Sequence, residues 1–298
     1  WDDLARELDN ARGADLVAKC SGVGGWDMEL AEAVLELKAP GTLVAFWDVD
    51  APQTLAAAFA ELPDTAGTFR ALIPEYDLIL LYGGGPPVQA AYAELGADEA
   101  HLIYNAADPD EYYAVPRQPH RACDVLFMGN RMPDREQRVK DLFLTAAELA
   151  PELSFILGGN GWQQEHLPKN VRSIGHVPTT QHRAWNCSAR LVLNINRTDM
   201  AVTGFSPPTR VFEAAGCGSC IVTDVWQGIE IFFEPGREIL IASSAEDIVS
   251  LARTTSAEQA RAIGAAARKR VLRDHTYARR AVELDALLTR CAGLRKAA

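Results

Sequence analysis

Short apolar runs alternate with amphipathic segments of helical period along nearly the whole chain. In the first third, runs of strand length that end in Gly, Asp or Pro cover residues 14–20, 42–47, 77–82 and 101–104. Segments of helical period lie between them at residues 28–37, 54–62 and 88–95. Strands that alternate with helices predict parallel sheets covered by helices on both faces, and therefore an α/β fold.

The alternation stops at residues 105–121, where Asp108-Pro109, Pro116 and Pro119 interrupt any helical or strand period. We expect the linker between two domains in this segment. The alternation then resumes, with strands at residues 124–128, 154–157, 171–174, 191–195 and 220–223 and helices at residues 135–149 and 180–187. The pattern predicts two Rossmann-like, doubly wound domains, residues 1–112 and 113–275. A helical tail begins at Ser256, and its last part, residues 276–298, is long enough to cross back to the first domain.

Length and composition agree with a soluble two-domain protein. The 298 residues suffice for about two domains, and the balance of 48% apolar and 23% charged residues is that of an ordinary globular protein. A net charge of -11 without a basic run disfavours nucleic acid or an anionic membrane as partner. The longest apolar stretches are strand-sized, so we expect no transmembrane segment. The chain begins at Trp1 without a basic leader, so we expect no signal peptide and a first domain that lacks its first strand.

The six cysteines mostly neighbour apolar or small residues, which is typical of small core residues in a reduced, cytoplasmic protein. Cys217-Gly-Ser-Cys220 has the spacing of a redox or metal pair. No second pair or histidine cluster accompanies it, so we expect no metal site there.

Five loops at predicted strand ends stand out, and ligands of open parallel sheets bind at such ends. In Gly129-Asn130-Arg131 the glycine permits close backbone approach and the arginine suits a phosphate, although a plain turn with solvated arginines is the alternative. Gly158-Gly159-Asn160-Gly161 has more glycines than a turn needs, which favours close approach to another group. Its spacing is not that of a dinucleotide fingerprint, which disfavours a dehydrogenase.

The third loop, residues 204–218, carries the strongest signal. Ser206 is a good N-cap and Pro207 and Pro208 suit a first helical turn, so we expect a helix here whose free amides and dipole attract an anion. Glu213 lies within an apolar stretch, where a buried carboxylate needs hydrogen-bond donors. The hydroxyl groups of a ribose would supply them.

Two further loops belong to the first domain. Asp48 and Asp50 follow a strand at positions i and i+2, where they either orient or deprotonate an acceptor hydroxyl or cap the next helix. The loop Gly83-Gly84-Gly85-Pro86-Pro87 is either a helix-entry turn or part of a ligand site.

The segment 206–223, together with Trp226–Glu230 and Phe233–Leu240, resembles the carboxyl-terminal domain of group-1 glycosyltransferases. It is most similar to the CgeB-like (spore maturation protein type) branch, which shows Ser-Pro-x-x-Arg-x-x-Glu-Ala-Ala-x-Gly, an apolar strand and a Pro-Gly-x-Glu turn. The resemblance is specific over about the last 175 residues. In the first domain, residues 48–52 and 105–113 resemble the family's Asp-x-Asp-x-Pro loop and its domain linker.

The resemblance implies a GT-B fold, in which two Rossmann-like domains face each other across a cleft. The second domain would hold a nucleotide-diphosphate sugar, and the first an acceptor that is a glycan, a protein or a small molecule. Glu213 would bind the ribose, Arg210, Arg131 and the backbone of Ser206–Thr209 the diphosphate, and His176-Val177 the base. The donor-binding residues implied are Gly129, Asn130, Arg131, Gly159, Asn160, His176, Val177, Ser206, Thr209, Arg210 and Glu213, and the catalytic ones Asp48 and Asp50.

The resemblance implies no cofactor and no metal as a rule, and the donor-side loops offer no Asp-x-Asp for a cation. Related retaining enzymes carry a second glutamate eight positions before Glu213, where this chain has Phe205, so the stereochemistry stays open. His176 and His182 are expected to be structural rather than catalytic. Two alternatives remain: a sugar-nucleotide epimerase or hydrolase of the same fold, or a non-catalytic protein that binds nucleotide sugars or glycans.

Overall fold

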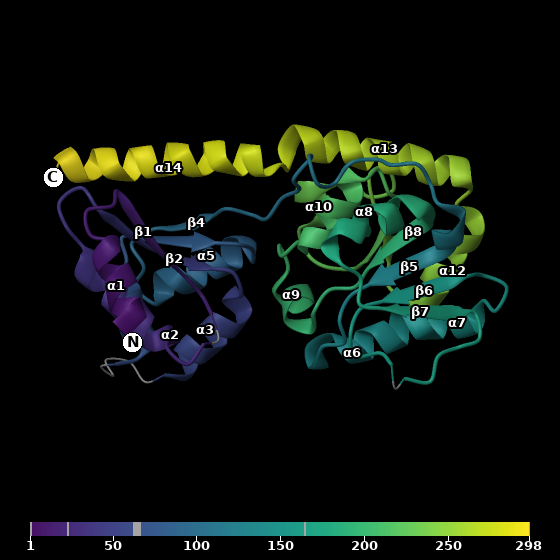
Figure 1. Cartoon of the computed structure of the whole chain (residues 1–298), viewed down its shortest axis with the longest axis horizontal. Coiled ribbons are helices and arrows are strands. Elements are labelled where there is room, and N and C mark those ends of the chain that lie inside the picture. The colour runs from purple at the N-terminus through teal and green to yellow at the C-terminus, as the bar shows by residue number, and fades with distance from the viewer. Residues whose placement is uncertain (1, 23, 62–66, 164, 298) are drawn as a thin grey trace. The chain divides into compact units, whose positions relative to one another are not determined.

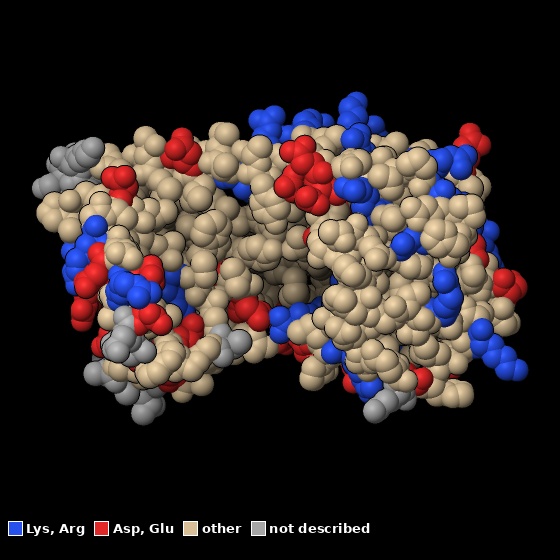
Figure 2. Space-filling model, viewed as in Figure 1, with Lys and Arg blue, Asp and Glu red and all other residues tan. Residues whose placement is uncertain are grey.

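The computed structural model describes residues 2–22, 24–61, 67–163 and 165–297 and divides into two compact units (Figure 1). The first unit consists of Trp1–Tyr104 and Arg280–Ala298, and the second of Asn105–Arg279. The division therefore falls at residue 104 rather than at 112, and the predicted linker lies with the second unit. On the face seen in Figure 2, acidic and basic side chains are interspersed over both units.

The first unit contains a parallel sheet with the strand order β1-β2-β3-β4. Its strands are β1 (Leu16–Cys20), β2 (Leu43–Asp48), β3 (Leu78–Leu81) and β4 (Ala100–Leu102). The helices are α1 (Asp2–Asn10), α2 (Asp27–Ala33), η1 (Val34–Leu37), α3 (Ala51–Ala60), α4 (Phe69–Leu72), η2 (Ile73–Glu75), α5 (Gly85–Glu94) and the tail helix α14 (Tyr277–Ala297). The strands lie within two residues of their predicted positions. Helix α1 was not predicted, and Leu62, the predicted end of α3, lies outside the described residues.

The sheet of the first unit has a buried core on each face, because successive side chains of a strand point to opposite sides. Val44 and Phe46 pack against the helices that connect the strands. Leu43 and Ala45 face the other way, into a cluster that contains Leu287 of α14. Strands in simple sequence order with right-handed crossovers place all their connecting helices on one face. The tail helix therefore covers the face that the crossovers leave open.

The second unit contains a parallel sheet with the order β10-β9-β8-β5-β6-β7. The strands are β5 (Cys123–Met128), β6 (Phe155–Gly158), β7 (Val171–Gly175), β8 (Ala189–Asn194), β9 (Ile221–Asp224) and β10 (Leu240–Ala242). The helices are η3 (Pro119–Arg121), α6 (Pro133–Val139), η4 (Lys140–Leu144), α7 (Thr145–Leu149), α8 (Thr179–Ser188), α9 (Thr198–Thr203), α10 (Thr209–Gly216), α11 (Ile229–Phe232), α12 (Ala245–Thr254) and α13 (Ala257–Asp274). The chain order reverses between β5 and β8, so this sheet is doubly wound as predicted.

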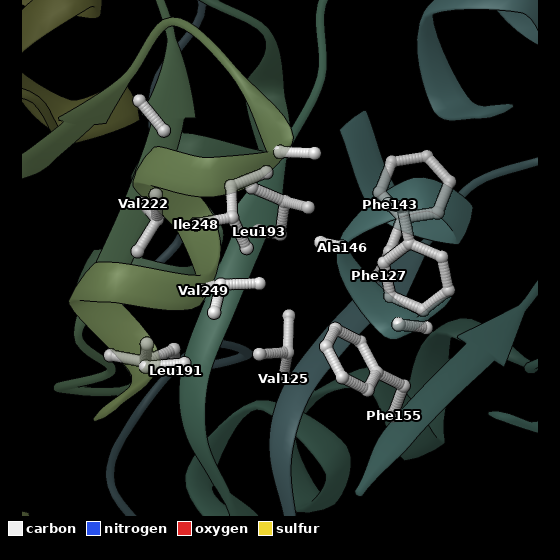
Figure 3. Packing of buried hydrophobic residues seen from close by; sticks show 14 of the residues in the cluster. Val125, Phe127, Phe143, Ala146, Phe155, Leu191, Leu193, Val222, Ile248 and Val249 are labelled. Carbon is white, nitrogen blue, oxygen red and sulfur yellow. The ribbon is translucent and has the colours of Figure 1, made fainter. Parts of the chain in front are cut away.

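Helices α7 and α12 pack side by side over one face of this sheet, and α8, α10 and α13 pack together. Figure 3 shows the core beneath α7 and α12, where aromatic rings fill one half and aliphatic side chains the other. The residues labelled there are Val125, Phe127, Phe143, Ala146, Phe155, Leu191, Leu193, Val222, Ile248 and Val249. The strands that contribute Val125, Phe127, Phe155, Leu191, Leu193 and Val222 were predicted from the same apolar runs.

Two predicted helices are interrupted in the structure. The predicted helix 135–149 begins at Pro133 and contains a π turn at η4. The predicted continuous tail breaks at His275 and Thr276, because Ala107 donates its backbone N–H to the His275 oxygen (3.0 Å) and accepts one from Tyr277 (3.2 Å). None of the helices in the described part of the chain is long and apolar enough to cross a membrane.

Gly264 allows α13 to approach the turn that follows α10. A Cβ atom at this position would lie 2.0 Å from the carbonyl oxygen of Gly218, a backbone atom that cannot rotate away. Glycine inside a helix is normally less stable than alanine by about 1 kcal/mol. We predict that Gly264→Ala nevertheless lowers the free energy of unfolding, by about 1–3 kcal/mol, in a urea titration.

Gly293→Ala in α14 is the matched control, because a Cβ there meets nothing within 4 Å. This variant should be neutral or more stable by up to about 1 kcal/mol. Equal effects of the two substitutions would show that α13 does not depend on this close approach.

Candidate functional site

A cavity of about 220 Å³ opens in the second unit where β5, β6 and β7 end, beside α8 and α10. The carboxyl ends of the strands are where ligands bind in sheets of this type. Predicted donor-binding residues that line the cavity are Gly129, Asn130, Gly159, His176, Val177, Arg210 and Glu213. Thr179, His182 and Asn186 of α8 also line it and were not among the predicted residues. Arg131, Asn160, Ser206 and Thr209 do not line it.

The two glycine-containing loops are bonded to one another. Gly159 has a φ of 123°, and a Cβ there would lie 2.2 Å from the Gly129 oxygen. The Asn160 N–H donates to Oδ1 of Asn130 (2.9 Å), and the Arg131 N–H donates to the Asn160 oxygen (2.8 Å). The close approach predicted from the glycines is therefore between the two loops. These bonds give the cavity a fixed wall.

Arg131 is engaged outside the cavity. Its guanidinium group forms ion pairs with Glu136 (2.6 Å) and Glu165 (3.4 Å). The hydrogen bonds from Arg131 and Lys140 lower the pKa of Glu136 to about 2. Arg131 thus already has anionic partners.

Arg210 differs from Arg131 because it lines the cavity and lacks such partners in the described part of the chain. Its guanidinium group forms no hydrogen bond or ion pair with any residue that the structure describes. It lies 5.5 Å from the ring centre of Phe127, whose ring is also 5.7 Å from the guanidinium of Arg135. Burial lowers the pKa of Arg210 to about 10; the charge of Arg135 acts in the same direction, and the carboxylate of Glu213 acts against both. A half-buried cation whose N–H groups find no acceptor among the described residues is unfavourable, so this position is suited to an anionic ligand.

Arg135 adds a second positive charge beside Arg210. One of its Nη atoms donates to the Asn130 oxygen (2.6 Å), while its Nε is buried without a partner among the described residues. Burial lowers the pKa of Arg135 as well.

The helix that carries Arg210 begins at a different residue from the one predicted. Helix α10 begins at Thr209, with Pro208 in extended conformation before it. The prediction that Ser206 is the N-cap is wrong: its hydroxyl is buried and donates to the Gly204 oxygen (2.9 Å). A residue that precedes a proline is disfavoured in helical conformation, so Pro207 and Pro208 delay the helix instead of opening it.

Glu213 lies one turn after Arg210 on α10 and is half-buried at the cavity. The charge and hydrogen bonding of its carboxylate act on the hydroxyl of Tyr112, which the sequence did not indicate. Near the base-side turn, His182 Nε2 lies 3.1 Å from the Val177 oxygen, and His176 Nδ1 lies 3.5 Å from Asn160 Nδ2. The first contact holds the turn Gly175–Val177 against α8, and the second joins it to the loop after β6.

Asp48 in the first unit is fully buried at the end of β2. Its carboxylate accepts hydrogen bonds from the Tyr92 hydroxyl (2.6 Å), the Thr54 hydroxyl (3.0 Å) and the Asp50 N–H (3.0 Å). Burial raises the pKa of Asp48 although these bonds oppose it. These contacts tie the end of β2 to α3 and α5 through Thr54 and Tyr92, and none of these three bonds comes from a backbone N–H within α3.

Asp50 is half-buried at the N-cap position of α3, and its side chain makes no cap hydrogen bond. Gly84 has a φ of 86° and precedes the first residue of α5, so the loop 83–87 is a helix-entry turn.

The spacing of Cys217 and Cys220 is that of a redox or metal pair, but the two thiols are not bonded to each other. Cys217 and Cys220 are both buried and free. The thiol of Cys187 donates instead to the backbone oxygen of Cys217 (3.5 Å). Among the described residues, no group of three or more His, Cys, Asp or Glu side chains is placed to hold a metal ion.

The family model described as "Glycosyl transferase-like" matches residues 135–286, about half of the chain and most of the unit with the cavity. The chain belongs to this glycosyltransferase family. The predictions of a glycosyltransferase and of an α/β fold of the GT-B type are confirmed, and the acceptor is not identified. No curated protein matches the chain.

Solved glycosyltransferase structures share the fold at low sequence identity. HepE from Anabaena in complex with UDP-glucose is 14% identical with a TM-score of 0.66, over 96% of this chain and 81% of HepE. Sucrose-phosphate synthase from Thermosynechococcus elongatus is 13% identical with a TM-score of 0.68, over 97% and 76% of the two chains. The pneumococcal O-GlcNAc transferase GtfA, in complex with UDP and GlcNAc, is 13% identical with a TM-score of 0.61, over 97% and 59%.

We predict that Tyr92→Phe destabilises the glycosyltransferase. The substitution removes a hydrogen bond to the buried carboxylate of Asp48, which should lower the free energy of unfolding by about 1.5–3 kcal/mol. Chemical denaturation measures this loss. Nucleotide binding should be unchanged, because Tyr92 and the cavity belong to different units. If the variant is as stable as the wild type but loses transfer activity, Asp48 would instead have a role in acting on the acceptor.

Proposed function

We propose that the enzyme transfers a glycosyl group from a nucleoside-diphosphate sugar whose nucleotide binds in the cavity of the second unit. The observation that carries this proposal is Arg210, a half-buried cation that lines the cavity beside Arg135 and makes no hydrogen bond or ion pair with any described residue. The charge of the Glu213 carboxylate offsets only part of the effect of burial and of Arg135, because the pKa of Arg210 stays lowered. A diphosphate would supply further negative charge and the missing acceptors through charge-assisted hydrogen bonds. In this proposal two guanidinium groups, Arg210 at the cavity and Arg135 beside it, stabilise the phosphates, and no cofactor or metal is proposed for this step.

In this proposal the arginines act mainly on the leaving group. When the bond between the sugar and the diphosphate breaks, negative charge develops on the phosphate oxygens. Cations already in place stabilise that charge without reorganising, and they act more strongly in a partly buried site than in water. Electrostatic placement would therefore supply much of the catalysis.

We propose that Glu213 accepts hydrogen bonds from the ribose and that the turn at His176 and Val177 lies along the base. The lining of the cavity supports this division, because Glu213 lies one helical turn from Arg210 and the turn at His176 and Val177 lines the same cavity. HepE and GtfA were solved with uridine nucleotides. UDP-glucose is therefore the first donor to test.

We further propose that the enzyme belongs to the CgeB-like branch, is cytoplasmic, and holds its acceptor on the first unit. The motif Ser206–Gly216 supports the branch. Because Asp48 is fully engaged in hydrogen bonds, Asp50 is the better candidate to orient the acceptor hydroxyl.

We predict that Arg210→Gln weakens UDP binding about 10-fold to 100-fold, the effect of losing hydrogen bonds from a charged group. Isothermal titration calorimetry measures this change. Arg131→Gln is the matched control, because it removes an arginine that is paired with Glu136 and Glu165 outside the cavity. Its affinity for UDP should stay close to that of the wild type. If Arg131→Gln weakens binding more than Arg210→Gln, the diphosphate site is misplaced.

We predict that Asp50→Asn lowers the rate of transfer by about 100-fold while donor affinity stays nearly unchanged, as expected for an acid–base group on the acceptor side. Release of UDP from UDP-glucose, with and without a panel of monosaccharide acceptors, measures the rate. Turnover of the donor without any acceptor would favour a hydrolase or epimerase. Weaker donor binding with normal turnover would show that the roles of the two units are reversed.

A further inference from the structure

Residues 105–118 form an irregular strap across α8 and α10 of the second unit. Arg183 of α8 donates to the Glu111 oxygen (2.9 Å), and the Gln118 N–H donates to the Ser188 hydroxyl (3.0 Å). The Tyr112 N–H donates to the Asp108 oxygen (2.8 Å), which closes a turn within the strap. The backbone at Tyr112 is therefore fixed from both sides.

Gly216 lets the strap lie directly on α10. A Cβ at Gly216 would be 2.7 Å from the Tyr112 oxygen and 3.2 Å from the Tyr112 Cβ. Gly216 follows Glu213 by three residues, so both face the same side of the helix. The absence of a side chain at Gly216 thus brings Tyr112 within reach of the Glu213 carboxylate.

The Tyr112 hydroxyl lies close enough to the Glu213 carboxylate to interact with it. Burial raises the pKa of Tyr112 above its ordinary value, and the charge of Glu213 and its interaction with the hydroxyl raise it further. The hydroxyl therefore stays protonated at physiological pH and has a hydrogen to direct toward the carboxylate. An ionised carboxylate has about four acceptor positions, so others remain for a ligand.

We infer that Tyr112 is a positioning residue whose hydroxyl fixes the Glu213 carboxylate in the orientation that accepts the ribose hydroxyl groups. This inference rests on the proposed role of Glu213. A glutamate side chain has several rotatable bonds, and a ligand that must order them binds less tightly. The interaction with Tyr112 orders the carboxylate before the nucleotide arrives.

The test compares UDP with 2′,3′-dideoxy-UDP, which lacks both ribose hydroxyls, by calorimetric titration. The wild type should bind UDP about 10-fold to 100-fold more tightly than the dideoxy form. Tyr112→Phe keeps the ring but removes the hydroxyl. It should reduce this preference about 5-fold to 10-fold and leave the affinity for the dideoxy form nearly unchanged.

Tyr113→Phe is the matched control. The ring of Tyr113 packs on the guanidinium of Arg183 (4.0 Å), and its hydroxyl makes no hydrogen bond within the described part of the chain. This variant should keep the wild-type preference, and both variants should melt close to the wild type.

An unchanged preference in Tyr112→Phe, with a clear preference in the wild type, would overturn the positioning role alone. An equal loss of affinity for both nucleotides would also overturn it, because a ribose-specific role cannot affect the dideoxy form. Equal affinity of the wild type for the two nucleotides would overturn the ribose role of Glu213, and this inference with it.

Discussion

Burying a guanidinium group that has no hydrogen-bond acceptor or ion-pair partner is unfavourable, yet the second unit half-buries Arg210 in this way among its described residues. The surrounding structure keeps it in place. The ring of Phe127 lies beside it, and the Glu213 carboxylate, one turn further along α10, offsets part of the effect of burial. Glu136 and Glu165 are paired with Arg131 outside the cavity. Arg135 adds a like charge rather than a compensating one. This positive charge, which is only partly compensated, is the physical feature from which the proposed chemistry follows.

The fold explains how this charge comes to face a cavity. Parallel strands end at one edge of the sheet, so the loops after β5 and β6 meet there and bond to each other through Gly159 and Asn160. The chain then crosses to β8 and returns through α10, which carries Arg210 and Glu213 on one side. The loops with Gly129 and Gly159 and the side chains of Arg210 and Glu213 thus line one cavity. A nucleoside diphosphate has groups that suit both side chains, hydroxyls for Glu213 and anionic phosphates for Arg210.

Much of the fold and of the candidate site could be predicted from the sequence. The remaining features depend on contacts between residues, and no local sequence pattern indicates these contacts. The strands were predicted because their apolar runs fill the core, and Arg210 and Glu213 because they stand in a recognisable motif. The N-cap at Ser206 was wrong because two prolines shift the helix start to Thr209. Tyr112 has no periodic pattern around it, and its partner Glu213 is about a hundred residues away. The sequence feature that could have indicated Tyr112 is Gly216, because the lack of a side chain at this position is explained only by the strap that lies against it.

A crystal structure of the protein with UDP tests the central claim most directly. The account predicts the nucleotide in the cavity of the second unit, with phosphate oxygens within hydrogen-bond distance of the Arg210 guanidinium and the ribose hydroxyls at Glu213. UDP bound elsewhere, or bound in this cavity with its phosphates directed away from Arg210, would contradict it.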